Sequence, residues 1–162
     1  MKTLHKGQAL IHILAPGPLN YSFVKEGLNY YGDLVKKWVK VEYHFPKIKE
    51  RFLTKEERLR GEAEILNRLI PKKAYLIVLD ERGKTLSTRE FSELLKKELE
   101  EKREVVFIIG GPEGLAEDLK KRANFLLKLS DFTLNHEITL LVLIEAIFRA
   151  LSIVKGHPYH RE

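Results

Sequence analysis

Hydrophobic runs alternate with stretches of helical spacing along this chain, a pattern typical of alternating strands and helices. Runs of apolar or alternating residues that end at turn residues predict strands. The predicted strands are Gln8–Leu14, Val39–Phe45, Ala74–Leu79, Val105–Ile109 and Phe125–Leu129. Because the runs at 74–79 and 105–109 are continuously apolar, we expect them in the middle of the sheet. The alternating strand 39–45 is expected nearer an edge.

Helical periodicity and capping signals predict five helices between and after these strands. Thr54 and Ser87 are each followed three residues later by a glutamate, a capping box that opens a helix. The predicted helices cover residues 21–38, 54–69, 87–102, a segment ending near 124, and 137–154. Such alternation predicts an α/β fold, a mostly parallel sheet with helices on both faces.

Length and composition indicate one domain spanning residues 1–162. The chain is 44% hydrophobic and 32% charged, as in globular proteins, and it has no cysteine for disulfides or a cysteine-based zinc site. The start of the chain lacks the uninterrupted apolar core of a signal peptide. The apolar run Glu137–Val154 holds Glu145 and Arg149, which are costly in lipid. We therefore expect a cytoplasmic protein with no membrane partner.

The net charge of +6 is concentrated in one segment. Residues 35–73 hold twelve Lys and Arg against six Asp and Glu, which matches the whole excess. One interpretation is a surface for a polyanion such as nucleic acid. The alternative is a solvated face of mixed lysines and glutamates, which the interleaved acidic residues favour.

The terminal helix is apolar around most of its circumference. A chain of this size has little material to cover such a helix on all sides, so a subunit interface is expected. The alternative is a central core helix. Glu145 and Arg149 lie four residues apart, which predicts an ion pair within the helix, although Arg149 is also available for a phosphate or a developing charge.

The apolar strand at 105–109 runs into a glycine-rich turn, Gly110-Gly111-Pro112-Glu113-Gly114. Ligands of parallel sheets bind beyond the carboxyl ends of strands, where this turn lies. It matches neither the dinucleotide fingerprint nor a phosphate loop. Because Glu113 would oppose a phosphate, a neutral or cationic ligand is favoured; the alternative is a plain strand-to-helix turn.

Other polar residues have simpler interpretations. Asp80 follows a strand and is predicted to be a turn residue before Gly83 rather than a catalytic carboxylate. Asn135, beside His136 and Glu137, is predicted to cap a helix rather than to bind a metal. The single histidines near strands are expected to be structural or at the surface, and no metal is predicted: His5, His12 and His44.

The chain ends with an unusual density of reactive groups, in the segment His157-Pro158-Tyr159-His160-Arg161-Glu162. Gly156 is predicted to end the helix and Pro158 to stop it. Tyr159, His160 and Arg161 would then be free to fold over a neighbouring site.

Four segments together resemble one known family. They are Phe107–Leu115, Leu129–Leu134, Glu145–Ala150 and His157–Glu162. In this order they are similar to the RlmH family, SPOUT-class methyltransferases that act on N3 of a pseudouridine in large-subunit ribosomal RNA. The resemblance spans nearly the whole chain. Its specific motifs lie in the carboxyl-terminal half, and the amino-terminal half matches only in layout and in Leu79-Asp80-x-x-Gly83.

The resemblance implies a carboxyl-terminal trefoil knot, a homodimer, and S-adenosyl-L-methionine bound in the knot. It also implies 23S ribosomal RNA, in the assembled ribosome, as substrate. The residues matching the cofactor-binding positions of the family are Leu79, Gly110, Gly111, Leu129, Ser130, Asp131, Phe132, Thr133 and Leu134.

By the same resemblance, Arg149, Tyr159, His160 and Arg161 match the catalytic and RNA-facing positions, and the tail is expected to reach the cofactor site across the dimer interface. His160 is the candidate base or proton relay, with Tyr159 and Arg161 orienting the substrate. The chain departs from the family at Asn135, Glu137 and Leu140. Two alternatives stay open: a related knotted methyltransferase for another nucleotide or for ribose oxygen, and a non-catalytic RNA-binding module.

Overall fold

The computed structural model describes residues 8–48 and 54–161, which form ten elements in strictly alternating order. The strands are β1 (Leu10–Leu14), β2 (Lys40–His44), β3 (Tyr75–Thr85), β4 (Glu104–Ile108) and β5 (Phe125–Lys128). The helices are α1 (Ser22–Val35), α2 (Lys55–Arg68), α3 (Thr88–Lys102), α4 (Glu117–Arg122) and α5 (His136–Val154). The predicted α/β alternation is confirmed.

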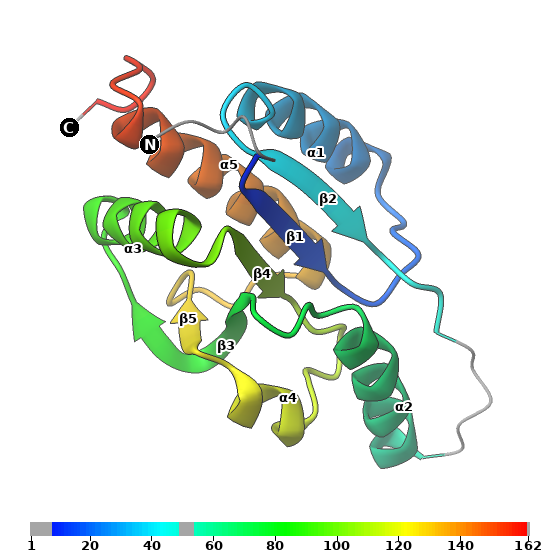
Figure 1. The fold of residues 1–162 in the computed structure, drawn as a ribbon. Coiled ribbons are helices and arrows are strands. Elements are labelled where there is room, and N and C mark those ends of the chain that lie inside the picture. The colour runs from blue at the N-terminus through cyan, green and yellow to red at the C-terminus, as the bar shows by residue number, and fades with distance from the viewer. Residues whose placement is uncertain (1–7, 49–53, 162) are drawn as a thin grey trace.

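The five strands form one sheet in the order β2-β1-β4-β3-β5, and every pair is parallel (Figure 1). β4 lies at the centre with β1 and β3 beside it; β1, β4 and the apolar run Leu76–Val78 of β3 are buried. β2, which alternates in hydrophobicity, is an edge strand. The predicted places of the apolar and alternating strands are therefore confirmed.

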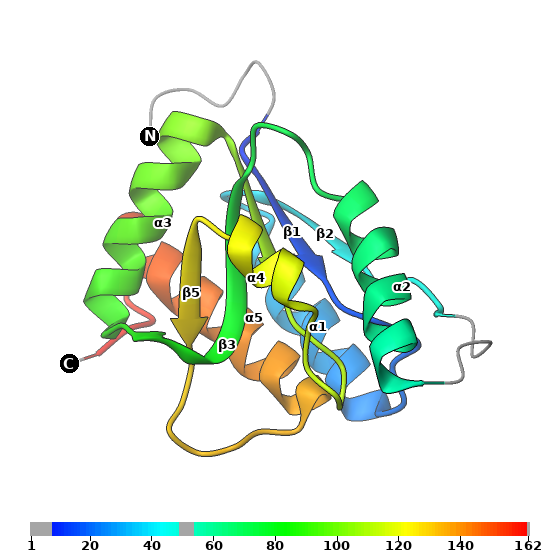
Figure 2. The ribbon, with the colours of Figure 1, turned by 90° about the horizontal axis from the view of Figure 1, so that it is seen from below.

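Helices cover both faces of the sheet, as Figures 1 and 2 show from two directions. One face packs against α1, α3 and α5 through Ile11, Ile77 and Phe107, and the other packs against α2 and α4 through Leu14, Val106 and Ile108. Side chains two apart on one strand share a face, so this alternation follows from the strand pleat. The result is a three-layer domain.

β3 is longer than its apolar run predicts. The predicted strand ended at Leu79, but β3 continues through polar residues to Thr85 and pairs with β5 again after an irregularity between Leu79 and Lys84. Asp80 is therefore a strand residue, and its prediction as a turn residue was wrong. Gly83 permits this pairing, because a Cβ there would lie 2.7 Å from the Leu126 carbonyl.

The predicted helix ends agree with the observed capping. Ser87 and Glu90 form the reciprocal capping box of α3, and the Thr54 side chain accepts from the amide of Glu57 at the start of α2. Gly156 has a positive φ of 69°, and the amides of Gly156 and His157 donate to the carbonyls of Ile153 and Ser152. This is the Schellman arrangement, which ends α5 where the glycine predicted it.

α5 lies between α1 and α3 on one face of the sheet and makes extensive contact with both. Leu140, Ile144 and Ile147 are fully buried within the chain, whereas Val142 is 38% exposed. The core-helix interpretation therefore holds for one side of α5, and an uncovered apolar strip remains on the other. Across the described ranges, no helix is long and apolar enough to cross a bilayer.

Candidate functional site

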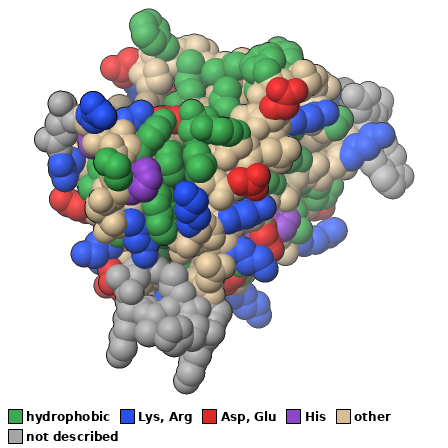
Figure 3. Space-filling view, turned by 90° about the horizontal axis from the view of Figure 1, so that it is seen from above, with side chains coloured by type: hydrophobic (Ala, Val, Ile, Leu, Met, Phe, Trp, Pro, Cys, Tyr) green, Lys and Arg blue, Asp and Glu red, His purple; other side chains and the backbone are tan. Residues whose placement is uncertain are grey.

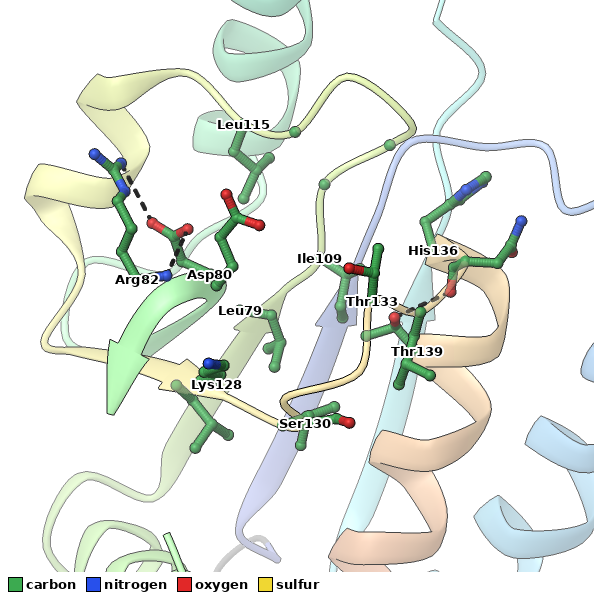
Figure 4. A pocket seen from close by; sticks show the side chains of 18 of the residues that line it. Leu79, Asp80, Arg82, Ile109, Leu115, Lys128, Ser130, Thr133, His136 and Thr139 are labelled. Atoms are coloured by element: carbon green, nitrogen blue, oxygen red, sulfur yellow. Dashed lines mark hydrogen bonds and ion pairs between the residues drawn. The ribbon is translucent and has the colours of Figure 1, made fainter. Parts of the chain in front are cut away.

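A cavity of about 960 Å³ opens at the carboxyl ends of β3, β4 and β5 (Figure 4). In an open parallel sheet a ligand usually binds beyond the carboxyl ends of the strands, where this cavity lies. Leu79, Ile109 and Leu115 supply apolar wall, and charged side chains such as Asp80, Lys120 and Lys128 line it as well.

The glycine-rich turn after β4 forms one wall of this cavity. Gly110 is required by the turn itself, because a Cβ there would lie 2.7 Å from backbone atoms of Gly114. A Cβ on Gly111 would meet only Pro16, at 3.8 Å, so the protein does not require a glycine at that position. Gly111 therefore leaves space at the cavity wall that a ligand can approach closely.

The loop after β5 forms the opposite wall. It contains the predicted cofactor residues Leu129 to Leu134, all of which line the cavity together with Leu79, Gly110 and Gly111. Its backbone has no regular secondary structure, so its amides and carbonyls are not used by a helix or a strand ladder there. Nine residues chosen from the sequence are thus brought together around one space. Phe132 is 84% exposed beside the opening, an unusual position for a large aromatic side chain.

Two contacts within this loop set its local charge and shape. Lys128 pairs with Asp131 at 2.7 Å, and the hydrogen bond from Lys128 holds the pKa of the Asp131 carboxyl below its usual range. The Ser130 hydroxyl accepts from the backbone amide of Phe132 at 2.9 Å. Asp131 therefore stays ionised at the rim of the cavity.

Asp80 enters the cavity from β3 with a side chain only 5% exposed. Arg82 at 3.4 Å and Lys120 at 3.6 Å partner its carboxylate, and Figure 4 shows the pair with Arg82. A nearly buried carboxylate with these cations is well held within β3, where the apolar part of the strand ends. The turn interpretation overlooked this residue, although its place directly after an apolar strand was the available signal.

The start of α5 closes another side of the cavity, where His136 and Thr139 line it. The Asn135 side chain accepts from the amide of Glu137 at 2.8 Å, so the predicted helix cap is confirmed. Glu137 is 1% exposed, and its carboxylate accepts from the amides of Asn20 and Tyr21 at 2.8 and 3.0 Å. Glu137 thus joins the start of α5 to the start of α1.

The departures from the family pattern therefore have structural explanations. Asn135 caps α5 and Glu137 ties it to the segment before α1. Leu140 is fully buried in the core on the α5 face of the sheet. The presence of these three residue types is therefore explained by contacts within the protein, without a contact to a ligand.

The glycine-rich turn is also linked to the basic segment. Arg58 of α2 donates two hydrogen bonds of 3.0 Å to the Glu113 carboxylate. Burial and then the Glu113 carboxylate raise the pKa of the neighbouring Glu62 carboxyl. The exposed cations of α2, such as Lys55 and Arg60, therefore lie on a helix that touches the cavity wall.

The carboxyl-terminal tail folds back onto α5 rather than standing free. The Tyr159 hydroxyl donates to the Glu145 carboxylate at 2.7 Å, and Arg149 donates to the same carboxylate at 2.7 Å. The Arg149 guanidinium also contacts Nδ1 of His160 at 3.2 Å and lies over the Tyr159 ring at 4.8 Å. The predicted ion pair of Glu145 and Arg149 is thus confirmed as the centre of a larger network.

Aromatic packing holds this tail in place. The Tyr159 and Phe148 rings have centroids 4.5 Å apart, and His157 lies edge-on to Trp38 at 5.6 Å. Burial, then the bond to Glu145, raises the pKa of the Tyr159 phenol. Tyr159 is therefore a neutral donor in this arrangement.

The tail does not reach the cavity of its own chain. Thr139 is the last residue along the chain that lines the cavity, and Arg149 lies ten residues further along α5, about 15 Å away along the helix axis. The predicted site residues thus form two separate groups. The expectation that the tail folds freely over a site is wrong for the single chain, because α5 and the end of α1 hold it.

The cavity presents charges of both signs beside apolar side chains. Its lining holds three carboxylates, and each is paired with a cation: Asp80 with Arg82 and Lys120, Glu113 with Arg58, and Asp131 with Lys128. These pairs offset the charge of the carboxylates, so the preference for a neutral or cationic ligand inferred from Glu113 stays a prediction. The irregular backbone of the loop 129–134 offers hydrogen bonds to a heterocycle.

Comparison with known proteins gives one consistent family. The family described as "Predicted SPOUT methyltransferase" matches residues 10–160. A protein named "Ribosomal RNA large subunit methyltransferase H" from Caldicellulosiruptor saccharolyticus is 35% identical over 94% of this chain and 100% of its own. Proteins of the same name from Dictyoglomus thermophilum and Chromobacterium violaceum are 36% and 40% identical over 93% and 94% of this chain, and over 98% and 99% of their own.

These matches cover the strands, the cavity and the tail together, over almost the full length of each relative. The resemblance seen in the sequence motifs is thereby confirmed. The chain belongs to the SPOUT methyltransferases, within the family of large-subunit ribosomal RNA methyltransferases H.

Proposed function

We propose that this protein methylates N3 of a pseudouridine in 23S ribosomal RNA, in the assembled ribosome, with S-adenosyl-L-methionine as methyl donor. The observation that carries the proposal is the cavity at the carboxyl ends of β3, β4 and β5, lined by all nine residues that match the family's cofactor positions. The relatives are named for methylation of large-subunit ribosomal RNA. Pseudouridine N3 comes from the family resemblance.

The walls of the cavity fit this cofactor. It supplies an electrophilic methyl group on a positively charged sulfur, next to an adenosine and an amino acid. The loop 129–134 offers backbone groups to the adenine edge, and Gly111 leaves room for close approach. The carboxylates of Asp80 and Asp131 lie in the same lining, each already paired with a cation of the protein.

The reaction forms a carbon–nitrogen bond at N3, breaks the sulfur–methyl bond, and releases the N3 proton. The protein must hold N3 in line with the methyl group and accept or relay that proton. Tyr159 is a poor base because its pKa is raised and its hydroxyl already donates to Glu145. His160 is the candidate base from the family match. In this structure its Nδ1 accepts a hydrogen bond from Arg149, so that bond must be released before the ring takes a proton there. The exposed Arg161 is available to the RNA backbone.

We propose further that the working unit is a homodimer with the family's knot. Within one chain the cavity and the tail are separate, so a complete site requires the tail of a second copy. A surface suitable for pairing lies on α1 and α5, where hydrophobic side chains gather in Figure 3. Its exposed large residues are Tyr21, Phe23, Tyr30 and Val142.

The basic segment is proposed to contact ribosomal RNA. Its exposed lysines and arginines in the described ranges lie on α2, at the start of β2 and in the connections after α1, β2 and α2. Arg58 links α2 to the glycine-rich turn. Phosphate contacts there would place an RNA strand beside the cavity. Glutamates on the same helix limit the charge, so the contact is expected to be local rather than extended.

Two measurements test the function. Calorimetry on the purified full chain should detect one S-adenosyl-L-methionine per chain, and mass mapping of ribosomal RNA from cells lacking the protein should reveal one missing methyl group on a pseudouridine. Loss of a methyl group from another nucleotide or from ribose would replace the proposed target with a different one. An unchanged modification map, together with no cofactor binding, would leave only a non-catalytic RNA-binding role.

A further inference from the structure

Two histidines that the sequence analysis treated as separate are brought together on the sheet. His12 of β1 and His44 of β2 are 32 residues apart, yet Nδ1 of His12 lies 3.2 Å from Nε2 of His44. Glu42, the register partner of His12, points to the same face of the sheet. One ligand atom from each of His12, Glu42 and His44 lies within 4.8 Å of the others.

We propose that His12, His44 and Glu42 form a binding site for one divalent transition-metal ion of the zinc class. Two imidazole nitrogens and one carboxylate oxygen are a ligand set that such ions take, with water completing the coordination. The site lies on the face of the sheet covered by α2 and α4, away from the residues that line the cavity.

The separation of the two nitrogens already suits a metal. With zinc–nitrogen bonds of about 2.0–2.1 Å at a tetrahedral angle, two ligand nitrogens lie about 3.3–3.4 Å apart. The observed 3.2 Å is close to this value; the contact is a hydrogen bond in this structure, so the rings would turn until both lone pairs point at one ion. The Glu42 side chain is half-buried on an edge strand, where rotation of its side chain brings the carboxylate into the coordination shell.

Glu104 orients the first of these ligands. Its carboxylate lies 3.2 Å from Nε2 of His12, and because a carboxylate only accepts, Nε2 carries the hydrogen. The lone pair of His12 is then on Nδ1, which accepts a hydrogen bond from Nε2 of His44, so a bound ion would replace the hydrogen on that nitrogen. A carboxylate on the outer nitrogen of a metal-binding histidine is a recurrent arrangement, which fixes the tautomer and the ring.

Burial makes this cluster more than a surface coincidence. His12 is 6% exposed, and its neighbours hold it in one orientation. His44 and Glu42 are only half-buried, so an ion has a path from solvent.

The bound ion would cross-link β1 and β2 at the edge of the sheet. β2 pairs only with β1 in the sheet, and a metal shared by the two strands would add a cross-strand bond to their ladder. Through Glu104 this cross-link would extend to β4. Since binding to the folded state alone raises stability by mass action, the ion should raise the melting temperature.

The first test titrates zinc chloride into the metal-stripped full chain by calorimetry. One zinc ion per chain should bind, and the H44Q variant should bind at least about 100-fold more weakly, as expected for loss of a ligand. H157Q removes a histidine from the exposed tail and should bind zinc as the unaltered chain does. If the unaltered chain binds no zinc, or if H44Q binds it equally well, the site does not exist.

The second test separates metal positioning from folding. Cobalt(II) in a site of two nitrogens and one oxygen gives visible absorption bands, and E104Q should shift these bands and weaken binding about 10- to 100-fold. The melting temperature of each variant is also measured with and without zinc. The rise caused by zinc is then compared with the metal-free melting temperature of the same variant. Cobalt bands and a zinc-dependent rise that H44Q leaves intact would overturn the proposal.

Discussion

The two ends of α5 present different kinds of site. At its start, His136 and Thr139 line a cavity whose walls come from three strands and the loops that follow them, and carry both apolar and charged side chains. At its end, Glu145 and Arg149 hold a tail of polar side chains against aromatic rings. The first region is shaped to hold a ligand, and the second carries groups that can orient a substrate or move a proton. Neither region is a complete enzyme site.

This separation teaches that binding and chemistry are assigned to different segments of the chain. Ligand recognition depends on the sheet, since Gly110 and the β5 loop are placed by strand pairing. The reactive groups depend on one helix and its cap, because Gly156 turns the chain back at the end of α5. Substitutions in the two regions should therefore have separable effects.

The largest effect is expected from Gly110→Ala, because the added Cβ would meet the Gly114 backbone at 2.7 Å and displace the turn. Affinity for S-adenosyl-L-methionine should fall at least about 100-fold, or about 2.7 kcal/mol, measured by calorimetry. The matched variant is Gly111→Ala, whose Cβ meets only Pro16. Gly111→Ala should keep the melting temperature of the unaltered protein but still lower the affinity for S-adenosyl-L-methionine. Normal cofactor affinity in both variants would remove the turn from the binding site.

Deletion of residues 157–162 should lower the methyl-transfer rate and largely spare cofactor affinity, in contrast to Gly110→Ala. Cofactor affinity is expected to change only a few-fold, whereas the methyl-transfer rate on ribosomes should fall by about 100-fold or more, the upper range for loss of acid–base groups. Rates come from single-turnover transfer of a labelled methyl group. A truncated protein that methylates normally would show that the tail has no catalytic part.

Glu137→Ala should destabilise the joint between the cavity wall and α1. It leaves two amides, of Asn20 and Tyr21, without their carboxylate partner. The expected cost is about 3 kcal/mol, a drop in melting temperature of about 6–12 °C for a domain of this size. Thermal unfolding measures it, and Glu90→Ala, an exposed capping glutamate in α3, is the control with a smaller loss.

The smallest expected effect is a loss of folding stability at alkaline pH that depends on Tyr159 in the tail. The pKa of Tyr159 is raised in the folded protein, so the unfolded chain releases that proton first. The stability contributed by neutral Tyr159 is complete below about pH 10 and is lost as the pH rises through the higher folded pKa. Tyr159→Phe should therefore flatten the decline of stability above pH 10, followed by denaturant unfolding. An unaltered slope would mean that the phenol is not held as described.

Local patterns predicted most of the fold and the cavity wall. The strand and helix positions follow from periodicity and caps such as Ser87, and the residues after Leu79 and Ile109 meet because parallel strands end at one edge. The extension of β3 to Thr85 was not predicted, because its residues are polar and pair with β5 again only after an irregularity in the ladder.

Contacts that depend on packing between distant segments were not visible in the sequence. The pairing of His12 with His44 depends on the register of two strands. The place of the tail depends on its ring contacts with Trp38, in the turn after α1, and with Phe148 of α5. The knot and the pairing of two chains are still predictions from the family.

The central claim is that the cavity of one chain works with the tail of the other. It is tested by co-expressing two differently tagged inactive chains, one with Gly110→Ala and one lacking residues 157–162, and measuring methyl transfer by the mixed dimers. Each mixed dimer would hold one intact cavity facing one intact tail. Purified mixed dimers should therefore recover about half of the normal rate per dimer, while each parent dimer stays inactive. Mixed dimers that remain as inactive as their parents would contradict the account, because a tail that serves its own cavity has no complete site in that pairing.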